Sequence, residues 1–361
     1  MTIQRYVSLI AGFTILILTL IAGFNYVVNP YLIFNSPRID GVNAIKADIS
    51  NYVRQAKTYH PLNVQIDTLL VGNSRIEMGF NPNHRCLSSS TYNLGIPGAS
   101  VEMQVAYALN VLRQKPGMKR VIMSLDFTDF IHELNQAPSS SFSFSGQNSL
   151  SYFIDGRENE DFWFYSLKDK YMALLSLDAT TSSLKTLVLQ RETSATRMEK
   201  GFNPARDLAS STKIEGPYRI FEHTLGMLRD ILHNKAYRTV ALEQNTHYLA
   251  LQAMVDYTKT NSIELKLFIN PLHSSFYTLI DEAGLNDDLT RWNSDIKQFV
   301  ANNRLNCHFY DFGRIPGKTD EPYPDQTQTK ALNWFWEPAH YNEAFGDTLI
   351  ETITQPSCSA L

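Results

Sequence analysis

The chain has 361 residues, of which 43% are hydrophobic and 12% aromatic, so it can bury a large core in one elaborated domain or two small ones. Its formal net charge of -4 and the absence of a basic run or a basic-aromatic stripe argue against nucleic acid as a partner. Its three cysteines, Cys86, Cys307 and Cys358, are too few for a disulfide scaffold and too dispersed for a metal motif, although one pair could bridge in an oxidising compartment.

The first segment, residues 6–28, is apolar and long enough to cross a bilayer, which requires about 20 such residues. It exceeds the ~7–15 residues of a secretory signal core, and no small-residue cleavage site is obvious before residue 29. We therefore predict an uncleaved membrane anchor rather than a cleaved signal. Arg5 precedes the segment, whereas Arg38 and Lys46 follow it, and we predict that the tail lies inside and the large domain outside.

Strands and helices alternate after a polar connecting stretch. Residues 64–71 are rich in Val, Ile and Leu, which predicts a buried strand that delivers Ser74 to the turn after it. Residues 90–95 predict a second strand, residues 100–114 a capped helix and residues 120–125 a third strand. A strand, a helix and a strand in this order predict parallel pairing, because a crossover helix joins parallel neighbours.

The alternation stops after residue 130 and returns near residue 246. The intervening stretch leaves the carboxyl end of a strand, so we predict an insertion with its own helices over that edge of the sheet; a surface excursion with no role in a site is the alternative. Strands over residues 263–269 and 307–312 complete five, which predicts a three-layer α/β/α sandwich of the flavodoxin-like type. The predicted organisation is an anchor over residues 1–30, a first core part over 31–130, the insertion over 131–237 and a second core part over 238–361.

The candidate catalytic residues follow strands, because sites in open parallel sheets lie beyond the carboxyl ends of the strands. Ser74 would place its hydroxyl at this edge and its amide at a helix N-terminus; a serine cap on an ordinary turn is the alternative reading. A serine hydroxyl needs a base, and the base works best when a third group fixes its tautomer. His340 is the candidate base, and Glu337 could hold its other ring nitrogen, although an isolated histidine is more often a surface or capping residue.

The order of these parts resembles the SGNH/GDSL hydrolase superfamily. The resemblance is closest to its membrane-anchored, cell-envelope branch, which includes the D-alanyl transfer protein of the teichoic acid system and relatives that work beside membrane-bound O-acyltransferases. It implies a single-pass protein of the bacterial inner membrane with a periplasmic domain. The matching blocks are Gly72-Asn73-Ser74, Asn93-Leu94-Gly95, Ser124-Leu125-Asp126 and Glu337-Pro338-Ala339-His340.

The resemblance also implies roles for these residues. Ser74 would be the nucleophile, His340 the general base and then acid, and the amides of Ser74 and Gly95 the oxyanion-hole donors. Asp126 stands where the family has an asparagine that donates to the oxyanion, and an ionised aspartate only accepts. Either the hole has two donors, or Asp126 is structural and binds the turn that follows, which we favour. Two further departures are Asn73 in place of an aspartate and Glu337 in place of an aspartate.

Three further side chains could contact substrate. Arg75 could steady an anionic or carbonyl-bearing group, or form a surface salt bridge. His273 follows a strand and could line the cleft, or be a plain loop residue. Trp336 and its neighbours Trp334 and Phe335 could pack against sugar faces, although wedging of the last loop is the commoner use. No metal or nucleotide motif is visible, so we expect no cofactor.

Two functions of different classes remain open. The first is an acyltransferase or esterase that transfers or removes an acyl group, most plausibly acetyl, on a cell-envelope polysaccharide or related glycan. The second is a non-catalytic assembly partner that docks on a membrane-bound O-acyltransferase or a polysaccharide exporter; the departures at Asp126 and Glu337 motivate it.

Overall fold

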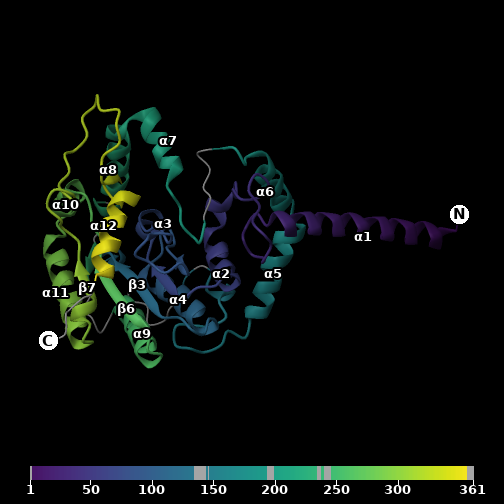
Figure 1. Ribbon diagram of the computed structural model, residues 1–361, viewed down its shortest axis with the longest axis horizontal. Coiled ribbons are helices and arrows are strands. Elements are labelled where there is room, and N and C mark those ends of the chain that lie inside the picture. Colours follow the sequence, from purple (N-terminus) through teal and green to yellow (C-terminus); the bar gives the residue numbers. More distant parts are fainter. Residues whose placement is uncertain are drawn as a thin grey trace.

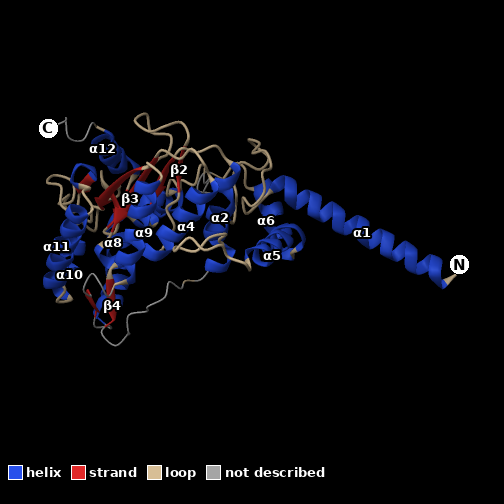
Figure 2. Ribbon diagram, turned by 90° about the horizontal axis from the view of Figure 1, so that it is seen from below, coloured by secondary structure: helices blue, strands red, loops and turns tan. Residues whose placement is uncertain are grey.

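The computed structural model describes residues 2–133, 144, 146–192, 199–233, 237–239 and 245–355, and Cys358 lies outside them. Its centre is a parallel sheet, whose strands are red in Figure 2. The strand order is β2-β1-β3-β6-β7. These strands are β1 (Thr68–Val71), β2 (Thr91–Asn93), β3 (Arg120–Leu125), β6 (Glu264–Ile269) and β7 (Phe309–Asp311). All five predicted strands are present, which confirms the α/β class and the parallel sheet. β1 begins later than predicted, because its pairing with β2 and β3 begins at Thr68.

Alternate side chains of the strands enter two separate apolar cores, as expected for a sheet with both faces buried. The larger core lies between the sheet and helices α4 (Val101–Gln114), α9 (Thr246–Thr260) and α11 (Asn286–Asn302). Leu69 of β1 and Val121 of β3 both lie in this core and are inaccessible to solvent.

The smaller core covers the opposite face of the sheet. Leu70 of β1 lies in it, together with side chains of α3 (Ser74–Gly79) and α12 (Glu343–Thr354). A Cβ on Gly346 of α12 would lie 1.6 Å from the carbonyl oxygen of Gly79, so only glycine at this position allows α12 and α3 to approach this closely. Helices therefore cover both faces of the sheet, and α3 carries Ser74 at its first position.

The stretch predicted as an insertion has paired ends and helices in two places. Its ends, β4 (Ile131–Glu133) and β5 (Tyr237–Thr239), form an antiparallel pair. Helices α5 and α6 pack against α1, whereas α7 and α8 pack against each other and lie farther from α1 (Figure 1). The helices are α5 (Phe162–Leu175), α6 (Leu177–Val188), α7 (Arg206–Glu215) and α8 (Pro217–His233). The sequence predicts that the helices of the insertion lie over the carboxyl edge of the sheet. Helix α8 lies there, beside Ser74, whereas α5 and α6 lie against α1.

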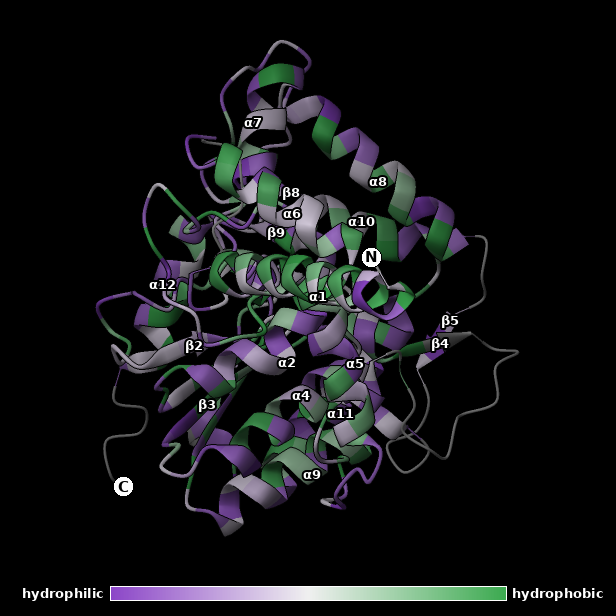
Figure 3. Ribbon diagram, turned by 90° about the vertical axis from the view of Figure 1, so that its right-hand side faces the viewer, coloured by the Kyte–Doolittle hydropathy of each residue, from purple (hydrophilic) through white to green (hydrophobic). Residues whose placement is uncertain are grey.

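The N-terminal helix α1 (Ile3–Val28) projects away from the rest of the molecule (Figure 1). Its most apolar 18-residue window has a mean hydropathy of 2.4 and no buried residue, and among the described residues it is the one helix long and apolar enough to cross a membrane. Figure 3, which looks onto the end of the molecule from which α1 leaves, shows apolar residues along most of this helix.

The C-terminal part ends in a short hairpin and α12. The hairpin, β8 (Phe335–Glu337) and β9 (His340–Tyr341), packs beside α8, and α10 (Ser274–Glu282) follows β6. Glu337 and His340 are register partners in this hairpin, so their side chains start from neighbouring backbone positions.

Candidate functional site

Ser74 lies at the turn between a buried strand and a short helix. β1 is fully buried, and Asn73 caps α3 by accepting a hydrogen bond from the backbone N–H of Arg75 at 3.0 Å. The N–H of Ser74 is among the first four of α3, which have no carbonyl partner within the helix. This turn gives the Ser74 hydroxyl a fixed position at the carboxyl edge of the sheet.

Three residues predicted to act together form a continuous chain of hydrogen bonds. The Oγ of Ser74 lies 2.7 Å from Nε2 of His340, and Nδ1 of His340 contacts Oε1 of Glu337. Because a carboxylate only accepts, Nδ1 carries the proton toward Glu337, which leaves Nε2 of a neutral imidazole free to accept the Ser74 proton. The arrangement can activate the serine as a nucleophile.

The loop between Glu337 and His340 is held at three backbone positions. The N–H of Ala339 donates to Oε2 of Glu337 at 2.8 Å, and its carbonyl accepts from Nε of Arg75 at 2.7 Å. The carbonyl of Pro338 accepts from the backbone N–H of His273 at 3.1 Å. These contacts fix the imidazole of His340 relative to Ser74, although the two residues are far apart in the sequence.

Glu337 is buried and ionised. Burial by itself raises the pKa of this carboxyl, but His340, the N–H of Ala339 and the guanidinium of Arg75 hold the pKa below its ordinary value. A carboxylate that stays charged at neutral pH can stabilise the imidazolium that forms when His340 takes a proton.

Arg75 and Asp126 form a buried ion pair beneath the site, which differs from both roles expected for Arg75. Its NH1 lies 2.9 Å from Oδ1 of Asp126, and only 7% of Arg75 is exposed. Oδ2 of Asp126 accepts from Nδ2 of Asn73 and from Nδ2 of Asn270, both at 2.8 Å. Asp126 is therefore structural, as favoured above, but it binds three side chains instead of the turn that follows it.

Gly95 does not fit the oxyanion role expected for it. Its N–H donates to Oδ1 of Asn93 at 2.9 Å, so this donor is already used. A Cβ at Gly95 would lie 2.4 Å from the backbone nitrogen of Glu77 in α3. Glycine is required here because the chain passes directly against the helix that carries Ser74.

His273 is a core residue and does not line the cleft. It is 1% exposed, its Nε2 donates to the carbonyl of Glu321 at 2.7 Å, and its Nδ1 accepts from the N–H of Ser275. Its ring contacts those of Phe221 and Phe335 edge-on. Burial lowers the pKa of His273, and its contribution to the site is the backbone hydrogen bond to Pro338.

The aromatic run before Glu337 packs mainly inward. Phe335 is fully buried in the smaller core, and Trp334 packs against Phe345 of α12. Phe335 and Trp334 therefore pack the last loop against the core, as the commoner use predicts. Trp336 is partly buried and does not line the cavity at Ser74.

A cavity of about 410 Å³ opens beside the Ser74 hydroxyl. One wall comes from α8, through Thr224, Met227 and Leu228, and another from Gly98 and neighbouring residues at the start of α4. Sequence reasoning anticipated a cover from the insertion but could not name these side chains, since they carry no catalytic signature.

Asp129 is a further titratable group that lines this cavity. Burial and the neighbouring carboxylate of Asp126 raise the pKa of Asp129 to about 8, although Arg75 and hydrogen bonds from Gln104 and Asn73 oppose the shift. The raised pKa favours the protonated carboxyl of Asp129, and in that form it can donate a hydrogen bond to a substrate oxygen. The sequence shows that Asp129 follows Asp126 by three residues, but it does not show the surroundings that raise the pKa of Asp129.

Replacing Asp129 with asparagine is expected to change how stability depends on pH. The pKa of Asp129 is about 8 in the folded chain, above the ordinary value of 3.8, so the unfolded chain loses this proton first and wild-type stability falls as pH rises from about 4 to about 8. Asp129→Asn cannot ionise, so its thermal midpoint should rise relative to wild type across this window. Asp256→Asn, at an exposed position of α9, is the control. Parallel curves for Asp129→Asn and wild type would contradict the assignment.

A second titratable pair lies behind α3. Lys57 is fully buried and donates to the carbonyls of Asn93, at 2.7 Å, and Gly201. Burial raises the pKa of Glu77 to about 7 and lowers that of Lys57 to about 8, and their mutual attraction opposes both shifts. This pair joins α2 (Val53–Asn63) to α3 and supports the helix that carries Ser74.

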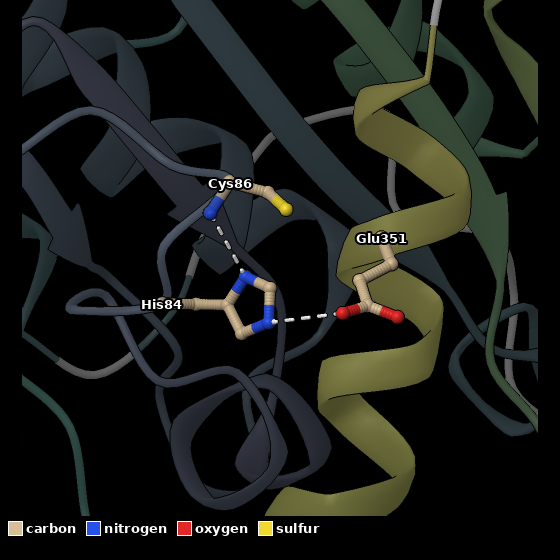
Figure 4. Close-up of side chains that lie close together, drawn as sticks. All are labelled: His84, Cys86 and Glu351. Atoms are coloured by element: carbon tan, nitrogen blue, oxygen red, sulfur yellow. Dashed lines mark hydrogen bonds and ion pairs between the residues drawn. The ribbon is translucent and has the colours of Figure 1, made fainter.

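One group of described residues could hold a metal ion, at a place separate from the cavity. Figure 4 shows His84, Cys86 and Glu351, whose candidate ligand atoms lie within 4.8 Å of one another. Nδ1 of His84 accepts from the N–H of Cys86 at 3.2 Å, which leaves the proton on Nε2, and Glu351 is paired with Arg85 at 2.6 Å. A cation would have to displace both the Nε2 proton and Arg85, and we assign none. Cys86 is exposed and forms no disulfide with a described residue.

Comparison with protein-family models and with curated proteins finds no match to this chain.

Proposed function

We propose that the chain is a membrane-anchored serine acyltransferase or esterase of the SGNH/GDSL type that acts through an acyl-serine at Ser74. The observation that carries this proposal is the hydrogen-bonded series from Ser74 through His340 to Glu337, facing an open cavity. Helices on both faces of a five-stranded parallel sheet, with the serine directly after β1, are compatible with the three-layer sandwich of that superfamily.

The first half-reaction transfers an acyl group to the enzyme. Nε2 of His340 takes the hydroxyl proton as Oγ of Ser74 attacks the ester carbonyl, and the negative charge develops on the carbonyl oxygen. The N–H of Ser74 and the protonated carboxyl of Asp129 are the donors available on the cavity side. Collapse of the intermediate breaks the ester C–O bond, and the imidazolium of His340 gives its proton to the leaving oxygen.

The second half-reaction returns the acyl group to an acceptor. His340 removes a proton from the acceptor hydroxyl, which attacks the acyl-serine, and the proton then returns to Oγ of Ser74. With water as acceptor the outcome is hydrolysis, and with a sugar hydroxyl it is transfer. The two outcomes use the same residues and differ only in which hydroxyl enters the cavity.

The proposed substrate class is an acylated cell-envelope glycan, with acetyl as the acyl group. The support is the resemblance described above, together with an apolar helix that would hold the domain at a membrane. On this proposal α1 crosses the inner membrane once, the cavity lies in the periplasm, and a membrane-bound O-acyltransferase is the source of acyl groups. No cofactor takes part in the proposed steps.

The two sequence departures that motivated the alternative, a non-catalytic assembly partner, do not support it in the structure. Glu337 reaches the imidazole despite its extra methylene, and Asp126 binds Arg75 beneath the site, so neither departure disrupts the series of hydrogen bonds. No described contact favours the alternative, and it is kept as an outcome of the experiment below.

The proposal is tested by intact-mass analysis of the full-length protein in detergent after exposure to a serine-reactive fluorophosphonate. We expect one adduct on wild type and none on Ser74→Ala or His340→Ala, with Ser275→Ala as a control at a serine outside the cavity. Labelled wild type should then be inactive on an activated acetyl ester. A folded wild-type protein that takes no adduct, and turns over no ester, would favour the assembly role.

A further inference from the structure

We propose that α5 and α6 form a platform that lies in the outer interface of the bilayer that α1 crosses. The platform is defined by its exposed apolar side chains, Trp163, Phe164, Leu167, Tyr171, Met172, Leu177, Leu184, Leu187 and Val188. The inference depends on α1 as a membrane span and is independent of the chemistry proposed at Ser74.

The platform is attached to the end of α1. Nδ2 of Asn25 donates to the carbonyl of Leu174 in α5 at 2.8 Å and to Oγ1 of Thr180 in α6 at 3.0 Å. Asn25 is fully buried by these contacts, in a helix whose first eighteen residues are exposed. Figures 1 and 2 show α5 and α6 at the end of the domain from which α1 leaves.

The length of the exposed part of α1 places the bilayer surface at this platform. Residues 6–20, which follow Arg5, are all exposed and, at 1.5 Å per residue, span about 23 Å. The hydrocarbon core of a bilayer is about 30 Å thick. The apolar segment that begins at residue 6 must therefore continue past residue 20 to cross this core, so the turn of α1 that α5 and α6 begin to cover falls at the interface. The platform therefore cannot stand clear of the membrane.

The side chains of the platform suit an interface. Trp163, Leu167 and Tyr171 recur at four-residue spacing on α5, and Leu177, Leu184 and Val188 share a face of α6. Trp163 is 67% exposed, Leu177 81% and Val188 80%, which is unusual for apolar residues of a water-exposed surface.

Lipid is the occupant that the surface chemistry favours over a second protein. Tryptophan and tyrosine concentrate where membranes meet water, because their rings are apolar with one polar group. The exposed side chains of Lys168 and Lys170 on α5 can reach lipid phosphates while their stems stay on the apolar surface.

The test uses the full-length protein in nanodiscs at one copy per disc, with lipids brominated near the headgroup end of the acyl chains. Bromine quenches tryptophan emission only on contact, and the four tryptophans lie at 163, 292, 334 and 336. We expect brominated discs to quench part of the wild-type emission, and Trp163→Phe to lose most of this quenching. The matched control, Trp334→Phe, should keep it. Absence of quenching in wild type, or equal quenching in Trp163→Phe, would overturn the proposal.

A second variant separates insertion from proximity. The double change Leu167→Glu and Leu184→Glu leaves Trp163 and α1 intact and should reduce the quenching, because charged side chains are expelled from the acyl region. The control is Ile214→Glu, at an apolar position of α7 that is 83% exposed and outside the platform. Quenching that the double variant retains in full, at unchanged helix content, would contradict insertion.

Discussion

Replacing Glu337 with glutamine is expected to slow fluorophosphonate labelling of Ser74 by about 10⁴-fold at neutral pH. Both oxygens of Glu337 are in use, one for Nδ1 of His340 and one for the N–H of Ala339. Glutamine has a single carbonyl oxygen, and when this serves Ala339 the amide NH₂ faces Nδ1. The imidazole must then carry its proton on Nε2, where it cannot accept the proton of Ser74. The measurement is the labelling rate, followed by intact mass.

Glu337→Asp is the matched control, because it keeps a carboxylate at this position. It should label much faster than Glu337→Gln, and both variants should keep the wild-type thermal midpoint within a few degrees. Labelling of Glu337→Gln at the wild-type rate would show that His340 needs no carboxylate partner, and the proposed series would be reduced to two residues.

Replacing Arg75 with methionine is expected to lower the free energy of unfolding by about 3–5 kcal/mol. Burial by itself lowers the pKa of Arg75, but the surrounding carboxylates, Asp126 first among them, raise it above its ordinary value, so the guanidinium is charged. Methionine fills a similar space but leaves Asp126 buried beside Asn73 and Asn270 without a counter-charge, and it frees the carbonyl of Ala339. Urea unfolding of the full-length protein in detergent measures the loss.

Two further variants identify the cause of this loss. Arg85→Met removes an arginine from an exposed ion pair with Glu351 and should leave the urea midpoint nearly unchanged. Adding Asp126→Asn to Arg75→Met removes the uncompensated charge and should recover part of the stability. A single Arg75→Met variant as stable as wild type would mean that the pair does not stabilise the fold.

Much of the fold could be predicted because the strands are short apolar runs that end at glycine or at a polar residue. Leu69 and Leu70, for example, enter opposite cores, and a run apolar at every position is what such a strand requires. Ser74, His340 and Glu337 could be named because each follows a strand or precedes a helix, and because nucleophile, base and carboxylate are a known chemical combination.

The remaining site residues could not be assigned from the sequence, because their roles depend on partners that are remote in the chain. The ring of His273 is satisfied by the carbonyl of Glu321, and a carbonyl leaves no mark in a sequence. The amide of Gly95 is used by its neighbour Asn93, which local pattern does not reveal. Asp129 acquires its raised pKa from burial and from Asp126, and the interface proposed for α5 and α6 rests on their packing against α1, which the sequence does not reveal.

The distance in sequence between the serine and its base also has a consequence for the order of events during synthesis. Ser74 and His340 are 266 residues apart, so at ~5–20 residues per second a ribosome takes roughly 13–53 s to pass from one to the other. During this interval the nascent chain carries an ordinary, unreactive hydroxyl. On the proposed function, the serine would become reactive only when the hairpin before the last helix docks, so a chain that is interrupted early should be inert toward esters.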